Sequence, residues 1–180
     1  MANRYWVGGS GNWSSTSHWS TSSGGSSGAS VPSTSDDVFI DSNSGFGSGG
    51  TITLDEQAFA NDLICTSGHT YTLNHDSTFG FSIYGSLTFE SGITNNNTIR
   101  FYSTSTDETV TTDGVTINGD VYFGGAGGKW TLQDDLVIVG EFYQQNGTVD
   151  ANDHNISAYD FYFYADTGYT PTVIMGSGTW

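Results

Sequence analysis

Carboxylate pairs are the residues of this sequence that could perform acid–base chemistry. They occur at three places, which are Asp36 and Asp37, Asp107 and Glu108, and Asp134 and Asp135. Two carboxyl groups facing one bond can hydrolyse a glycosidic linkage, one of them acting as the acid. Consecutive residues of a strand point to opposite faces, however, so no pair is a catalytic dyad by itself. We therefore expect no enzymatic activity, with polysaccharide degradation as the catalytic alternative.

Acidic turns are the second candidate for chemistry, because hard cations prefer oxygen ligands. The candidates for calcium are Asp134, Asp135, Asp150 and Asp153. The Gly-Gly-x-Gly-x-Asp repeat of calcium-binding solenoids is missing, so calcium is a hypothesis here and no other cofactor is expected. The four histidines lack the spacing of a zinc site.

Three tryptophans close together, Trp6, Trp13 and Trp19, form the first aromatic group. A stacked-strand protein needs a cap over its first turn, and these indoles have the apolar surface to provide one. Alternatively, they form a platform on which sugar rings stack. A second aromatic surface for glycans is predicted around Tyr159, Tyr162 and Tyr164.

Two other sites with chemical potential have structural interpretations. Cys65 is the only cysteine and follows Leu63 and Ile64, which indicates a buried, unreactive thiol. The glycine-rich segment 124–130 resembles a phosphate loop superficially, but Trp130 stands where that loop needs Ser or Thr. We interpret it as a corner between strands.

The elements that must position these residues are short strands. Thr, Tyr, Phe, Val and Ile alternate with small polar residues in brief runs, which is typical of an all-β protein. The predicted strands are 51–54, 62–65, 70–73, 80–89, 98–102, 108–111, 115–123, 129–132, 136–143, 147–149, 159–164 and 172–175.

A recurring pattern suggests how these strands are arranged. Glycine, a spacer, a large apolar residue and then threonine or the chain end occur at 50–54, 68–73, 128–132 and 178–180. Their large residues, Ile52, Tyr71, Trp130 and Trp180, are predicted to stack in turns of roughly 20 residues. The predicted fold is a right-handed parallel β-solenoid. A β-sandwich is the alternative, because Asp-Gly and Asn-Gly pairs between strands also favour hairpins.

Two segments are expected on this basis. Residues 1–37 form a Trp-, Ser- and Gly-rich cap or docking segment, and residues 38–180 form the solenoid. The segment 170–180 aligns with 120–130 but stops where the earlier copy continues. We expect the solenoid to continue beyond residue 180 or to be covered there by a partner chain.

Charge restricts the partners. Nineteen acidic residues face three Lys and Arg residues, for a formal net charge of −16. Without a basic cluster, nucleic-acid binding is not expected. No apolar run approaches the roughly 18 residues of a membrane span, so membrane insertion is not expected either. The N-terminus has no signal peptide pattern.

Several segments together resemble repeat-bearing structural proteins of tailed phages, and a related pattern occurs in bacterial surface adhesins. The segments are RYWVGGSGNW at 4–13, HWS at 18–20, GASVP at 28–32, DDVFID at 36–41, GTVDANDHNI at 147–156 and MGSGTW at 175–180. The resemblance implies a β-helical fibre, spike or decoration protein on a virion.

From the resemblance and the missing signal peptide, we expect a non-catalytic structural protein at the virion surface. Its expected partners are other virion proteins, copies of itself and host surface glycans. A carbohydrate-binding module or surface adhesin is the alternative function.

Overall fold

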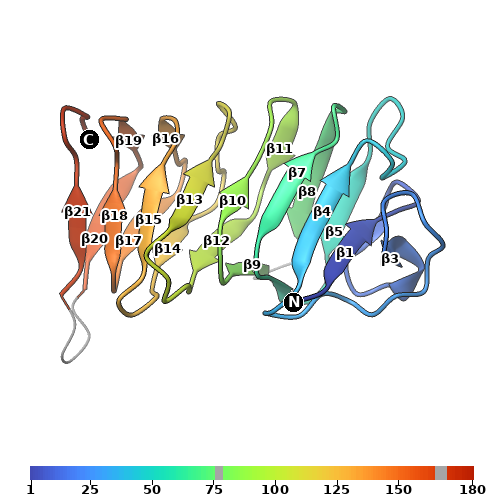
Figure 1. Cartoon of the computed structure of the whole chain (residues 1–180). Coiled ribbons are helices and arrows are strands. Elements are labelled where there is room, and N and C mark those ends of the chain that lie inside the picture. Colours follow the sequence, from blue (N-terminus) through green and yellow to red (C-terminus); the bar gives the residue numbers. More distant parts are fainter. Residues whose placement is uncertain (76–78, 165–169) are drawn as a thin grey trace.

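The computed structural model describes residues 1–75, 79–164 and 170–180, and it shows a β-solenoid (Figure 1). About six turns of short strands stack along one axis, and one 3-10 turn, η1 (Thr16–His18), is the helical element of the described part. The pairs between turns are parallel, which confirms the predicted solenoid and makes the sandwich alternative wrong.

Three faces surround the core. The first, sheet A, has nine strands, which follow one another along the axis in the order β3 (Trp19–Ser20), β1 (Asn3–Trp6), β4 (Asp37–Asp41), β7 (Leu63–Thr66), β10 (Leu87–Thr88), β13 (Glu108–Thr111), β15 (Lys129–Leu132), β18 (Thr148–Asp150) and β21 (Thr172–Ile174). This sheet is the front face of Figure 1.

The second face consists of two shorter sheets. Sheet B contains β2 (Gly11–Asn12), β5 (Thr51–Leu54), β8 (Tyr71–His75) and β11 (Ile93–Asn95). Isolated bridges at Ile117 link it to a two-stranded sheet of β16 (Leu136–Val137) and β19 (Ile156–Ser157). The ladder on this face is therefore interrupted halfway along the axis.

The third face, sheet C, is a continuous ladder of six strands. They are β6 (Ala58–Ala60), β9 (Gly80–Ile83), β12 (Thr98–Phe101), β14 (Val121–Phe123), β17 (Glu141–Gln144) and β20 (Asp160–Phe163).

Alternation of side chains builds the core. In β15, for example, Trp130 and Leu132 point inward and are fully buried, whereas Lys129 and Thr131 are half-buried on the outside. Equivalent inward residues then stack from turn to turn, as Phe101 does on Phe123 with ring centroids 4.7 Å apart. That distance matches the spacing of neighbouring strands.

The first turn carries the aromatic N-terminal segment. Strand β1 joins sheet A parallel to β4, and β3 pairs with the other side of β1 in the antiparallel direction. Trp6, Trp13 and Trp19 are fully buried, and Trp19 meets each of the other two edge to face. Residues of the predicted cap thus supply strands as well as apolar cover.

The length of a turn varies around the predicted value of roughly 20 residues, from 19 between Trp130 and Val149 to 25 between Val38 and Leu63. One column of sheet A contains Val38, Leu63, Leu87, Val110 and Leu132. Successive turns in this column therefore span 25, 24, 23 and 22 residues.

The glycine-containing repeats do not share such a column, so that alignment is wrong. Ile52 and Tyr71 lie on sheet B, whereas Trp130 lies on sheet A. The alignment of 170–180 with 120–130 also joins different faces, because β21 belongs to sheet A and β14 to sheet C.

Candidate functional site

Most of the acidic candidates are acceptors for backbone amides one turn away. Asp134 accepts hydrogen bonds from the amides of Thr112, at 2.9 Å, and Asp113. Asp113 in turn accepts from the amide of Ser91 at 2.8 Å. At these corners the amides have no carbonyl of a neighbouring strand as acceptor, and the carboxylates accept their hydrogen bonds instead.

The other three calcium candidates also have partners, two of them backbone amides and one a lysine side chain. Asp135 accepts from the amide of Asn155 at 2.8 Å, Asp153 from that of Ser177 at 2.6 Å, and Asp150 pairs with Lys129 at 2.7 Å.

These contacts hold the pKa of each of the three carboxyls below its ordinary value. The main causes are the backbone hydrogen bonds at Asp135 and Asp153 and the Lys129 ammonium at Asp150. No group of three or more His, Cys, Asp and Glu residues suited to a metal ion occurs within the described ranges. Calcium binding stays a prediction.

Consecutive carboxylates do separate as expected. Asp134 reaches back to the turn of Thr112, whereas Asp135 reaches forward to Asn155. Asp36 accepts from Ser33 in its own loop. Asp37 instead accepts from Asn61 at 2.8 Å in the following turn.

The aromatic candidates differ in accessibility. The Trp6, Trp13 and Trp19 indoles are fully buried and offer no open face to a sugar ring. Tyr159, in contrast, is 82% exposed and Tyr164 is 51% exposed. They lie near the last turn, where Phe163 and Trp180 are also about half exposed and pack edge to face.

Tyr162 belongs to a tyrosine ladder on the outside of sheet C, which we define as Tyr122, Tyr143 and Tyr162. The rings of Tyr122 and Tyr143 are parallel with centroids 4.2 Å apart, and those of Tyr143 and Tyr162 are 5.0 Å apart. Each hydroxyl donates to the carboxylate two positions earlier, which is Asp120, Glu141 or Asp160. The hydrogen bond to Glu141 raises the pKa of Tyr143. The ring faces between these tyrosines cover one another.

A groove that the sequence did not reveal lies at the corner between sheets C and A. Its volume is about 590 Å³, and we call it the corner groove. Three carboxylates from different turns line it, namely Asp37, Asp62 and Glu108, together with Tyr84 and Tyr102. Asp37 and Asp62 are 25 residues apart, which is one turn at this position of the solenoid. That spacing could have predicted the groove, but only if the register of the turns were known.

The carboxylates of the corner groove are connected through Ser86. The amide of Ser86 donates to Asp62 at 2.7 Å, and its hydroxyl donates to Glu108, also at 2.7 Å. Burial raises the pKa of Asp62, and the nearby charges of Asp37 and Glu108 raise it further against the effect of the Ser86 amide. The groove thus holds a carboxyl group with a reduced tendency to ionise.

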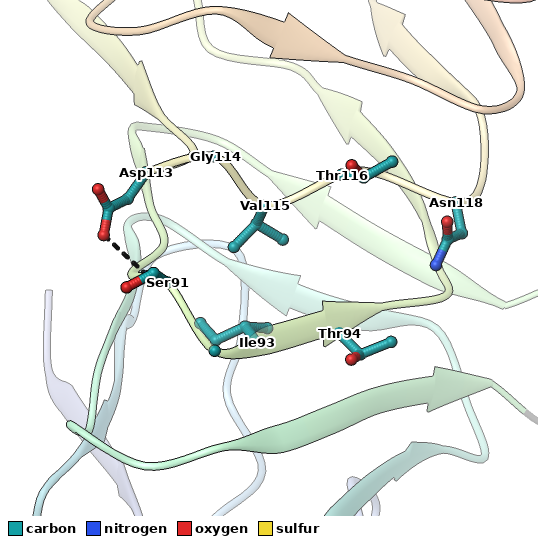
Figure 2. A pocket seen from close by; sticks show the side chains of 9 residues that line it. Ser91, Ile93, Thr94, Asp113, Gly114, Val115, Thr116 and Asn118 are labelled. Carbon is teal, nitrogen blue, oxygen red and sulfur yellow. Dashed lines mark hydrogen bonds between the residues drawn. The ribbon is translucent and has the colours of Figure 1, made fainter.

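A second depression, of about 310 Å³, occupies the interruption of sheet B (Figure 2). Ile93 and Val115 come from adjacent turns, and Ser91, Thr94, Thr116 and Asn118 supply polar groups. Its carboxylate, Asp113, already accepts from the amide of Ser91 across the gap. The depression is therefore a weaker candidate than the corner groove.

The two remaining sequence candidates, Cys65 and the glycine-rich segment 124–130, have structural roles. Cys65 is fully buried, which raises the pKa of its thiol to about 12 and suppresses thiolate chemistry. The glycine-rich corner 124–130 folds around Trp130, and a side chain at Gly125 or Gly128 would collide with the Ser103 carbonyl. Its Lys129 is paired with Asp150.

Comparison with protein families, with curated proteins and with solved structures finds no match to this chain. Among the residues with described structure, no helix is long and apolar enough to cross a membrane.

Proposed function

We propose that this chain is a non-catalytic structural protein, a β-solenoid rod that forms part of a phage appendage and displays its outer surface for assembly or host contact. The observation that carries the proposal is the use of its polar side chains. Four carboxylates each accept a hydrogen bond from a backbone amide of an adjoining turn, and these contacts stabilise the rod. They belong to Asp113, Asp134, Asp135 and Asp153.

The phage setting rests on the resemblance of the N-terminal and repeat segments to structural proteins of tailed phages. A solenoid suits such a role because neighbouring turns support one another along its whole length. In this proposal the chain works at the virion surface, with other virion proteins and copies of itself as partners.

Solution mass from light scattering tests the assembly part of the proposal. A stable trimer or larger assembly is expected, because the aromatic side chains Phe163, Tyr164 and Trp180 near the last turn are about half exposed. A monomer at concentrations up to about 100 μM would contradict it.

A carbohydrate-binding module is the second candidate, favoured by the exposure of Tyr159 and Tyr164. Quenching of intrinsic fluorescence by added oligosaccharides, abolished in the Tyr159→Ala Tyr164→Ala double variant, would support it. The catalytic alternative predicts the release of reducing ends from capsular polysaccharide, and we expect none.

A further inference from the structure

We propose that the corner groove is a binding site for an uncharged sugar ring, held between the side chains of Tyr84 and Tyr102 and the free carboxylate oxygens of Asp37 and Asp62. This inference concerns the side of the rod and does not depend on the phage setting.

The two groove tyrosines differ from the tyrosine ladder in their ring geometry. The rings of Tyr84 and Tyr102 are 5.7 Å apart and tilted by 41°, whereas Tyr122 and Tyr143 lie 4.2 Å apart at 3°. Tilted rings at the larger distance do not cover each other's faces. Both side chains are half-buried, so they are held in place while ring surface remains open to the groove.

The hydroxyl groups differ as well. The ladder tyrosines donate to an acid two positions earlier, but Ser82 and Arg100 occupy the corresponding positions before Tyr84 and Tyr102. Within the described residues, neither groove hydroxyl has a hydrogen-bond partner. Each can therefore donate to, or accept from, a ligand.

Acceptors complete the lining. One carboxylate oxygen of Asp37 binds Asn61 and one of Asp62 binds Ser86, which fixes the orientation of both side chains. In the described part of the chain, the second oxygen of each carries no hydrogen bond. Glu108, in contrast, uses both oxygens, one for Ser86 and one for Ser103.

These groups match a neutral sugar. The CH face of a pyranose can cover an aromatic ring, and its hydroxyls can both donate to the carboxylates and accept from the tyrosines. Three carboxylates repel uronic or sialic acids. A lysine side chain would use the carboxylates but would not fill a groove of about 590 Å³, a volume within the range of small-molecule sites.

The test is an array of neutral and acidic glycans, followed by titration calorimetry with the best neutral oligosaccharide. We expect binding to neutral glycans and a loss of affinity of at least about fivefold in the Tyr84→Ala Tyr102→Ala variant. The matched control is Tyr143→Ala Tyr162→Ala, which removes two stacked tyrosines outside the groove and should keep full affinity.

Four outcomes would overturn the proposal: no binding to any neutral glycan, binding restricted to acidic glycans, equal affinity in both double variants, or preference for an oligolysine peptide. Thermal melts of the two variants, followed by circular dichroism, verify that each is folded. Loss of affinity confined to Tyr159→Ala Tyr164→Ala would place glycan binding near the last turn and would also overturn this site.

Discussion

Backbone amides at the corners of the solenoid lack strand partners, and carboxylates of the neighbouring turn accept their hydrogen bonds. Asp134 does so for two consecutive amides, those of Thr112 and Asp113. A buried or half-buried amide without an acceptor loses its hydration without compensation. Individual acidic residues therefore hold adjacent turns together in a chain whose net charge is −16.

Replacing Asp134 by Ala should lower the free energy of unfolding by about 1.5–3 kcal/mol, because a charged acceptor is lost. The matched control is Asp107→Ala, whose exposed carboxylate makes no hydrogen bond in the described structure; its effect should stay within about 0.5 kcal/mol. Urea denaturation of both variants checks this. Equal stabilities would show that the Asp134 contacts contribute nothing.

The charged carboxylate of Asp62 should destabilise the folded state, in contrast to that of Asp134. Its pKa is raised above the ordinary 3.8 through burial and the charges of Asp37 and Glu108. A carboxyl with a raised folded pKa favours folding below its unfolded pKa, and this contribution is lost as the pH rises through the folded pKa.

Asp62→Asn, which can still accept from Ser86, should therefore raise the melting temperature at pH 7 by about 1–3 °C. The difference should shrink as the pH falls and vanish well below pH 3.8, where Asp62 is protonated in both the folded and the unfolded chain. Melting curves between pH 3 and 7 measure it, and a variant that is less stable at pH 7 would refute this assignment.

At the level of elements, much of the strand pattern could be predicted. The predicted strands 51–54, 108–111 and 129–132 coincide with β5, β13 and β15. The segments 80–89 and 136–143 each contain a corner and divide into two strands, and the short strands β6, β11 and β19 were missed.

The face to which each strand belongs could not be predicted. All faces show the same alternation of inward and outward residues, as β5 and β15 do, so the local pattern is identical. Because the length of a turn changes, a fixed period cannot assign the column either. The corner groove depends on that register, so the sequence alone does not bring Tyr84, Asp62 and Glu108 together.

The aromatic segment of the first turn gives a prediction at this scale. Trp13 is fully buried against Trp19 and Phe81, so Trp13→Ala should lower the free energy of unfolding by about 3–5 kcal/mol. The matched control is Trp180→Ala, because that indole is 54% exposed and should cost much less. Guanidinium denaturation compares the two variants, and a Trp13→Ala loss no larger than that of Trp180→Ala would contradict the prediction.

For the whole molecule, repulsion among like charges is the dominant electrostatic effect. Nineteen acidic residues accompany three Lys and Arg residues, and among the described residues one Lys or Arg side chain, Lys129, forms an ion pair, with Asp150. Salt screens such repulsion over distances beyond about 10 Å at 0.1 M. Electrostatics therefore oppose the compact state at low ionic strength.

Raising sodium chloride from 20 to 500 mM should consequently increase the melting temperature by several degrees. Differential scanning calorimetry at pH 7 measures the change. Salt also weakens the ion pair of Lys129 with Asp150, which opposes the expected effect. Lys129→Met, which lacks this pair, is therefore the control, and its melting temperature should rise with salt by an equal or larger amount. A melting temperature that falls with salt would mean that attractive pairs dominate.

The antiparallel strand β3 makes the two ends of the rod unequal. It lies beyond β1 at one end of sheet A, whereas β21 at the other end continues the parallel ladder. A strand of another copy could therefore extend the parallel ladder at β21. At the opposite end it would meet β3, an antiparallel strand of two residues. Two β21 edges related by a two-fold axis would pair antiparallel and close at two copies, so the trimer or larger assembly proposed above needs contacts other than this pairing.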